Sequence, residues 1–580
     1  MDIQRSILIV ALAIVSYFLV LKWNDDYGQA EMPPQQAATA PAAPSLPGSN
    51  GDQPGQSDVP TATSGTEAAA LPQGETPASA ELIRVRTDVL DVAIDPRGGD
   101  VVQLNLLQYP RRQDRPDVPF QLFDNGSERT YLAQSGLTGT NGPDARASGR
   151  PLYSSEQRSY QLANGQDVLT VDLRYSDNGV NYVKRFTFHR GLKESCSADD
   201  IAQRKVDCVT QNGYTVDVSY QIDNQSGQPW TGNLFAQLKR DNSGDPSSTT
   251  ATGVSTYLGA AMWTASEPYK KVSKGDMDDR SLKQTVDGGW VAWLQHYFVT
   301  AWVANKDQAN LVQTRKDSQG NYIIGFTGPA VNVPAGGQGT ASAVLYAGPK
   351  IQSHLGALSP GLELTVDYGF LWFLAQPIFW LLQHIHGLLG NWGWSIVMLT
   401  VIIKLIFFPL SAASYRSMAR MRAVSPKIQA LKEQFGDDRQ KMSQAMMELY
   451  KKEKINPLGG CLPILIQMPV FLALYWTLLE SVEIRQAPWI LWITDLSIKD
   501  PYFLLPIIMG ATMFIQQQLN PTPPDPMQAR VMKMMPIIFT FFFLWFPAGL
   551  VLYWIVNNTL SILQQWYITR QIQRATPAKA

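Results

Sequence analysis

WSIVMLTVIIKLIFFPLS, residues 394–411, is an apolar run of 18 residues with a single charged side chain, Lys404. A run of this length is typical of a helix that spans a lipid bilayer, which needs about 20 apolar residues. An ionisable residue inside such a span costs roughly 2.5–3.5 kcal/mol on insertion scales and marks a candidate functional site. Thr400 lies one turn earlier on the same helix face. Two interpretations stay open: Lys404 faces a polar cavity, or its side chain extends to the end of the span at Ser411, roughly 10 Å away.

Five further apolar runs accompany this one. Four follow it, at residues 461–481, 502–517, 531–546 and 548–568, and the last two meet in a tight turn at 545–549. Near the N-terminus, residues 6–21 carry no charge, which predicts an uncleaved membrane anchor over 1–23; a cleaved signal peptide is the alternative. The sequence therefore predicts six transmembrane helices, namely this anchor and a five-helix core over 391–570.

Residues 369–389 are also apolar, but Pro377 interrupts them and two histidines follow. We expect this run to form an amphipathic helix that lies in the membrane interface, within a segment covering 356–390. A transmembrane assignment would place either the N-terminus or the most basic loop on the outer side, against the distribution of charge.

The charge distribution predicts the orientation of the helices. The net charge of the chain is −1, so no global field favours nucleic acid, and we expect no DNA partner. Loop 412–458 carries ten Lys and Arg residues against five acids, and the tail 571–580 has two basic residues and no acid. By the positive-inside rule this loop and both termini are cytoplasmic, while residues 24–390 lie on the outer side.

The basic loop itself is predicted to form a helical hairpin. Ser425-Pro426 is typical of a helix start and Phe435-Gly436 of a helix end, and Asp438 is placed to cap a second helix that runs to Lys454. The basic side chains of this hairpin either face lipid headgroups or contact ribosomal RNA or a targeting factor. The candidates are Arg416, Arg420, Lys427, Lys432 and Lys451.

Between these membrane segments, residues 81–355 have the pattern of a β domain. Short segments such as NYVKRFTFH (181–189) alternate polar and apolar residues and are separated by turn residues, which predicts an antiparallel fold of two packed sheets. Residues 24–80, rich in Pro, Ala, Gly, Ser and Gln, are expected to be a disordered linker. Cys196 and Cys208 are candidates for a disulfide, which an oxidising compartment permits. Three cysteines in all exclude a disulfide-dense scaffold and a multi-cysteine metal cluster.

The sequence lacks the signatures of the common enzyme classes: a phosphate-binding loop, an H-E-x-x-H zinc motif and a dinucleotide fingerprint. His384 and His386 are two positions apart and do not share a helix face, which argues against a metal pair. We expect no catalytic residue, no cofactor and no metal. Polar residues interrupt the apolar runs, and they predict either a wet cavity or hydrogen bonds that join the helices. They include Gln467, Gln516, Gln517, Thr540, Asn557, Asn558, Ser561 and Gln565.

Three motifs give the chain a resemblance to a known family. NPLGGCLPILIQMPVFLALYW (456–476), SVEIRQAPWILWITDLSIKDPYFLLPIIMGATMF (481–514) and FFFLWFPAGLVLYWIVNN (541–558) resemble the YidC/Oxa/Alb membrane protein insertases. The N-terminal run, the Pro/Ala-rich linker and TDVLDVAIDPRGGDVVQL (87–104) are similar to the Gram-negative form, which has a large periplasmic domain. The resemblance implies a β-supersandwich related to sugar-binding enzymes, an inner-membrane location, and a role in inserting and helping to fold membrane proteins.

The resemblance also implies a mechanism and a set of residues. A hydrophilic groove, open to the cytoplasm and to lipid, contains one positive residue, which falls on Lys404, where relatives of this type usually carry Arg. Thr400, Gln467 and Asn557 are expected to line the groove with it. A hydrophobic slide for the substrate falls on Met468, Phe471, Phe542, Tyr553 and Trp554, where Trp554 replaces a more usual Tyr. The implied partners are nascent membrane proteins, the Sec translocon, the ribosome and the lipid bilayer.

Two other functions remain as alternatives. The first is a small-molecule or ion transporter that uses the lysine as an anion site, although transporters usually show paired repeats with broken helices. The second is a membrane-anchored periplasmic carbohydrate-active protein, for which the sequence offers no convergent pair of catalytic carboxylates or histidines.

Overall fold

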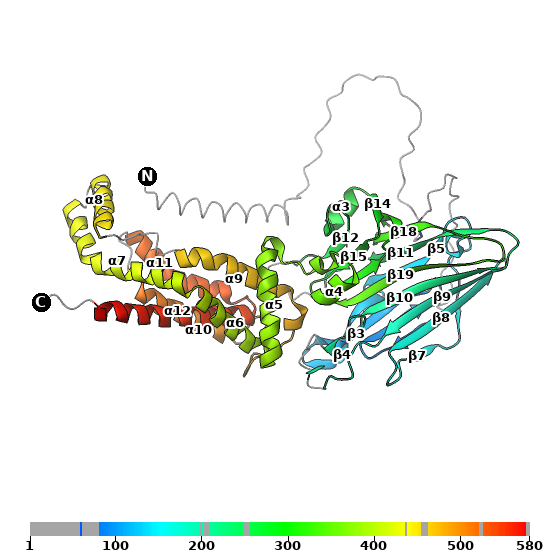
Figure 1. Ribbon diagram of the computed structural model, residues 1–580, viewed down its shortest axis with the longest axis horizontal. Helices are drawn as coiled ribbons and strands as arrows, with labels where there is room; N and C mark the ends of the chain where they lie inside the picture. The colour runs from blue at the N-terminus through cyan, green and yellow to red at the C-terminus, as the bar shows by residue number, and fades with distance from the viewer. Residues whose placement is uncertain are drawn as a thin grey trace, which may run out of the picture.

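The computed structural model describes residues 59–60, 81–197, 200–201, 208–247, 256–435, 438–453, 462–520 and 526–575. The expected anchor over 1–23, nearly all of the linker and the last part of the basic tail lie outside these ranges. The described chain forms an elongated molecule in which a β domain adjoins a helical bundle (Figure 1).

The first sheet of the β domain has ten strands, antiparallel except for the parallel pair β1–β7. Its order is β14 (Lys283–Asp287), β17 (Ala309–Lys316), β18 (Tyr322–Val333), β11 (Trp230–Arg240), β5 (Thr130–Thr138), β4 (Arg115–Asn125), β3 (Asp100–Arg112), β2 (Leu90–Asp95), β1 (Ile83–Arg86) and β7 (Ser159–Gln161).

The second sheet has nine strands and lies against the first. Its order is β13 (Lys270–Val272), β12 (Gly259–Met262), β15 (Trp290–Leu294), β16 (Phe298–Val303), β19 (Gln338–Pro349), β10 (Thr215–Asn224), β9 (Val180–His189), β8 (Val168–Asp177) and β6 (Ser154–Ser155). Side chains of the two sheets meet in the core: Phe120 stacks on Phe298 at 4.3 Å, and the Trp302 indole donates to the Gln237 carbonyl at 3.0 Å. The predicted two-sheet antiparallel domain is confirmed.

A network of charged side chains is buried between these sheets. Lys184, on the inward face of β9, donates to the carbonyls of Gly98, Gly99 and Ser135 at 2.8–3.0 Å. Arg150 forms ion pairs with Asp100 and Asp144. Burial lowers the pKa of Lys184 to about 7 and raises that of Asp144. Each charged group in the network has a partner, as buried charges require.

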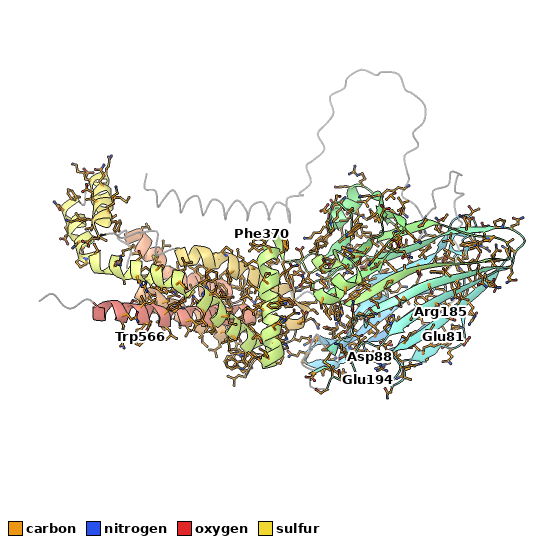
Figure 2. The ribbon with its side chains drawn as sticks, viewed as in Figure 1. Glu81, Asp88, Arg185, Glu194, Phe370 and Trp566 are labelled. Atoms are coloured by element: carbon orange, nitrogen blue, oxygen red, sulfur yellow. A yellow bond between two sulfur atoms is a disulfide. The ribbon has the colours of Figure 1, made fainter. Side chains whose placement is uncertain are left out.

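The bundle consists of α6 (Trp392–Ile406), α7 (Phe408–Phe435), α8 (Arg439–Lys452), α9 (Leu462–Glu480), α10 (Leu504–Leu519), α11 (Pro526–Phe543) and α12 (Ala548–Ala575). Helices α3 (Lys274–Asp279) and α4 (Gln352–Leu358) belong to the β domain, and the short 3-10 helices are Pro143–Ala145, Leu362–Thr365, Gly369–Leu371 and Val482–Ile484. α12 packs against α6, α7, α9 and α10. Trp566 lies on α12 in its half nearer the C-terminus (Figure 2).

The apolar run 394–411, expected to be one helix, is broken. α6 ends at Ile406, α7 begins at Phe408, and the two meet at 67°. Pro409 explains the break, because it lacks the N–H that would bond the carbonyl four residues earlier and its ring collides with that carbonyl. In the described ranges, no single helix is long and apolar enough to cross a bilayer, whereas α6 and residues 408–421 pass that test as a bent pair.

The helical hairpin of α7 and α8 differs in detail from its prediction. The expected helix start at Ser425-Pro426 is wrong, because α7 runs without interruption from Phe408 to Phe435 with Pro426 inside it. The Ala, Met, Arg, Lys, Gln and Leu residues on both sides are strong helix formers and offset the roughly 3 kcal/mol cost of one proline. Asp438 caps α8 as predicted, accepting from the amides of Gln440 and Lys441, but α8 ends at Lys452 rather than Lys454.

Helix α5 (Trp372–Leu389) lies across the bundle helices between the bundle and the β domain (Figure 1). One face is buried, through Ala375, Ile378, Phe379, Leu382 and Ile385, while Trp372, Phe373, Trp380, Leu388 and Leu389 are exposed. Phe370, just before the helix, is also exposed (Figure 2). The exposed face of α5 therefore carries large apolar side chains, as the buried face does. The histidines do not pair: the His386 ring stacks on Trp392, and His384 bonds the Trp380 carbonyl.

The β domain is attached to the loop between α9 and α10. The buried Arg485 donates to the Pro110 carbonyl of β3 at 2.9 Å, and its guanidinium lies over the ring of Phe298. Lys350 pairs with Glu480 at 3.6 Å, where both side chains are nearly inaccessible. His296, in the β15–β16 turn, bonds the Leu479 carbonyl through Nε2 at 2.8 Å. We call these contacts the junction.

We predict that the stability of the folded protein depends on pH through His296 of the junction. Burial lowers the pKa of His296 to about 4, below its ordinary value near 6.5, so the folded protein keeps the imidazole neutral. Between pH 6.5 and 4 the unfolded chain binds this proton more readily, and stability is lost as the pH falls, by at most about 1.4 kcal/mol per pH unit. In melting curves of the full chain between pH 7.5 and 5, His296→Gln should lose less stability on acidification than the unmodified protein. His384→Gln, at an exposed position, is the control, and identical pH profiles for His296→Gln and the unmodified protein would refute the assignment.

Candidate substrate groove

Lys404 lies in the last turn of α6 and points into the bundle. Its Nζ donates to Ser561 Oγ of α12 at 2.7 Å and to Gln467 Oε1 of α9 at 3.4 Å. The side chain is only 6% exposed, and its amine contacts two neighbouring helices instead of extending to the end of the span at Ser411. The geometry therefore favours the first of the two interpretations, a polar site inside the bundle.

The two acceptors of Lys404 are themselves held in place. Ser561 Oγ donates its proton to the Asn557 carbonyl at 2.8 Å, which leaves its lone pairs directed at the amine. Gln467 Nε2 donates to Asn557 Oδ1 and to the Tyr553 hydroxyl, the latter at 3.3 Å. Since an amide donates only through its nitrogen, these bonds fix the Gln467 oxygen toward Lys404. We call Lys404, Gln467, Tyr553, Asn557 and Ser561 the lysine site.

The lysine site contains no acid. Its oxygen ligands come from a hydroxyl and an amide, and no Asp or Glu in the described part of the chain forms an ion pair with Lys404. Uncharged acceptors hold an ammonium group but leave its charge uncompensated, so a carboxylate that entered the site would be attracted. The lysine site can thus bind an anionic group without displacing a protein counter-ion.

The structure unites three of the four expected groove residues, namely Lys404, Gln467 and Asn557. Thr400 is completely buried, and its hydroxyl donates to the Ile396 carbonyl of its own helix at 2.6 Å. Ser561 was not among the expected groove residues, yet it makes the shortest bond to the lysine. Its position four residues after Asn557 places both on one face of α12, which was the available signal.

The expected hydrophobic slide residues lie on α9, α11 and α12. Phe471 stands edge-on to Trp554 at 4.7 Å and stacks near Tyr553 at 6.3 Å. Met468 is 41% exposed and Phe542 is 56% exposed, whereas Tyr553 is buried and contributes its hydroxyl to the lysine site instead. Met468 and Phe542 are thus the exposed members of this set, and Met468 directly follows Gln467 in α9.

The hairpin of α7 and α8 carries the expected basic side chains. Arg416, Arg420, Lys427 and Lys451 are exposed, and Lys427 pairs with Glu453 across the hairpin at 2.6 Å. The Lys432 side chain lies outside the described atoms. At the base of the hairpin, Tyr415 packs with Ile568 of α12, which fixes α7 to the bundle.

Cys196 and Cys208 form a disulfide in the β domain. The third cysteine, Cys461, lies outside the described residues. Among the residues that are described, no three His, Cys, Asp or Glu side chains are grouped so as to hold a metal ion.

Comparison with known proteins gives the family. Residues 384–575 match the family described as 60Kd inner membrane protein, and residues 82–192 and 196–381 match the YidC periplasmic domain. The curated "Membrane protein insertase YidC" of Ectopseudomonas mendocina is 76% identical over all of both chains, and that of Pseudomonas aeruginosa PAO1 is 73% identical over 99% of each. A solved structure, an active YidC insertase with its first transmembrane domain resolved, is 19% identical, covers 84% of this chain and 93% of its own, and has a TM-score of 0.37. The chain therefore belongs to the YidC family of membrane protein insertases.

Proposed function

We propose that this chain inserts membrane proteins into the inner membrane, and that the lysine site receives the polar, acidic segments of its substrates. The observation that carries the proposal is a buried amine whose ligands, among the described residues, are all uncharged. An acidic segment bound there gains an electrostatic attraction that a neutral or basic segment lacks.

The membrane potential adds a direction to this attraction. With the outer side positive, a negative charge is drawn outward by about 2.3 kcal/mol per 100 mV. An acidic segment held at Lys404 has already entered the bundle, so the potential assists the rest of its crossing. The apolar part of the substrate then moves past Met468, Phe471 and Phe542 into lipid, driven by transfer of its apolar surface. This route needs no covalent step and no cofactor.

The proposal also includes the membrane topology of the chain and its partners. The N-terminal anchor, the bent pair of α6 with the start of α7, and helices α9 to α12 make six spans, with both termini in the cytoplasm and the β domain in the periplasm. The exposed basic residues of the α7–α8 hairpin suit an RNA or headgroup surface, and we assign to them the ribosome contact. The Sec translocon is proposed as a partner on the family resemblance.

The charge at position 404 should matter only for substrates that carry acids. Lys404→Leu should lower the insertion of a single-span substrate with an acidic N-terminal tail at least tenfold, the equivalent of about 1.4 kcal/mol. Lys404→Arg should retain most activity, because it keeps the charge. Proteoliposome insertion assays with acidic and neutral tails measure this, with Lys499→Leu in the α9–α10 loop as the control. Uptake of a small anion that depends on Lys404, without any effect on insertion, would support a transporter instead.

The route along α9 and α11 predicts specific contacts with the substrate. A photocrosslinking residue at Met468 or Phe542 should form adducts with a ribosome-bound single-span substrate, and these should fade as insertion is completed. Met398 of α6 is the matched control, because it is 43% exposed but belongs to neither the lysine site nor the slide. Equal adducts at all three positions would contradict a defined route.

Ser561 should act as a positioning residue for Lys404. Ser561→Ala removes the 2.7 Å acceptor and should reduce insertion of the acidic-tailed substrate several-fold while sparing the neutral-tailed one. Thr559→Ala is the matched control, since this exposed hydroxyl bonds only the Ile555 carbonyl of its own helix. If Ser561→Ala impairs both substrates equally, Ser561 merely supports the packing of the bundle.

A further inference from the structure

Two residues from the Pro/Ala-rich segment lie against the β domain. The Pro60 carbonyl accepts a hydrogen bond of 2.9 Å from Thr138 Oγ1, a partner 78 residues away in the sequence. Pro60 is buried, Val59 is half-buried, and Thr138 is only 1% exposed. The composition of residues 24–80 predicts disorder throughout, and for these two residues that prediction is wrong.

The chemistry of the contact explains why this dipeptide can bind at the end of β5. A buried hydroxyl needs a partner, and Thr138 ends β5, so no further strand residue supplies one. Proline offers a carbonyl but no N–H, so burying it leaves no backbone donor unsatisfied. Its fixed φ also reduces the entropy that is lost when the segment becomes ordered.

The backbone around Thr138 is shaped to bring this contact about. Gly139 has φ +97°, a conformation that favours glycine, and turns the chain sharply after β5. A Cβ at Gly142 would lie 2.4 Å from the Leu137 carbonyl, so the returning chain packs directly on the end of the strand. The turn thus holds Thr138 at a fixed position beside the incoming segment.

We propose that the end of β5 is a docking site for the linker, with Val59–Pro60 as its built-in ligand. Docking shortens the segment that joins the expected anchor to the β domain from residues 24–80 to residues 24–58, that is from 57 to 35 residues. At roughly 3.3–3.6 Å per extended residue, the maximum reach falls from roughly 190–205 Å to roughly 115–125 Å. The dock therefore reduces the distance by which the N-terminal anchor can move away from the β domain.

Distance measurements between spin labels in the full chain test the dock. Labels are placed at Ser57→Cys and Gly227→Cys in a Cys461→Ser background, with the Cys196–Cys208 disulfide left intact. Gly227 is suitable because an added Cβ would meet no atom within 4 Å. A bound segment gives a narrow distance distribution, and a broad distribution in this parent protein would overturn the proposal.

Two variants identify the contact responsible. Thr138→Val keeps the shape but removes the donor and should broaden the distribution, whereas Thr231→Val, which loses an exposed bond to Asn332, should not.

Replacing Val59 and Pro60 by glycine should broaden the distance distribution as well, while the same change at Leu46 and Pro47 of the linker should leave it narrow. Narrow distributions in both the Thr138 and the Val59–Pro60 variants would refute the dock, and unchanged melting of the β domain shows that each variant is folded.

Discussion

A primary amine enclosed by apolar helices is the constraint on which the bundle depends. Lys404 needs oxygen ligands, because an unsatisfied amine in a low-dielectric interior is costly. α12 supplies Ser561 and α9 supplies Gln467, whose own bonds to Asn557 and Tyr553 return to α12. The relative positions of α6, α9 and α12 are therefore tied to one side chain, and a shift of α9 or of α12 would remove one of its two oxygen ligands.

The lysine site differs from the buried charge network around Arg150 in the β domain. In the β domain, Arg150 is paired with two carboxylates, and Lys184 has three carbonyl acceptors close to the same acids. That network is electrically compensated and completes the core. At Lys404 the acceptors are a hydroxyl and an amide, without an acid. The network around Arg150 therefore offers a ligand little net charge, whereas Lys404 offers an ammonium charge that no acid in the described part of the chain pairs.

The periodicity of the apolar residues predicted most of the strands and helices, and local chemistry explains the features that it did not predict. Alternating polarity predicted the two sheets, and the apolar runs predicted α9 to α12, because an element that is buried on one or both faces has a regular pattern of apolar residues. The break between α6 and α7 at Phe407 does not change the apolar pattern, and Pro409 is the residue that indicates it. At the site, Lys404 was evident as a charge in an apolar run, but its ligands depend on how three helices pack. The sequence pointed to Ser561 only as one of the polar residues in the apolar runs, and its bond to Lys404 required the structure. Thr400, expected in the groove, is buried and donates to the Ile396 carbonyl of its own helix.

Helix α9 contributes residues to both the junction and the lysine site, and these two parts of the helix are held in different ways. At its C-terminal end, α9 is held by the Lys350–Glu480 pair and by the bond from His296 to Leu479. Twelve residues earlier, roughly 18 Å along a helix, Gln467 holds Lys404. Pro469 lies just after Gln467 and removes one helical hydrogen bond there. α9 is thus held by side chains at the junction, whereas its backbone lacks one hydrogen bond close to Gln467 and Met468, where the proposed substrate route begins.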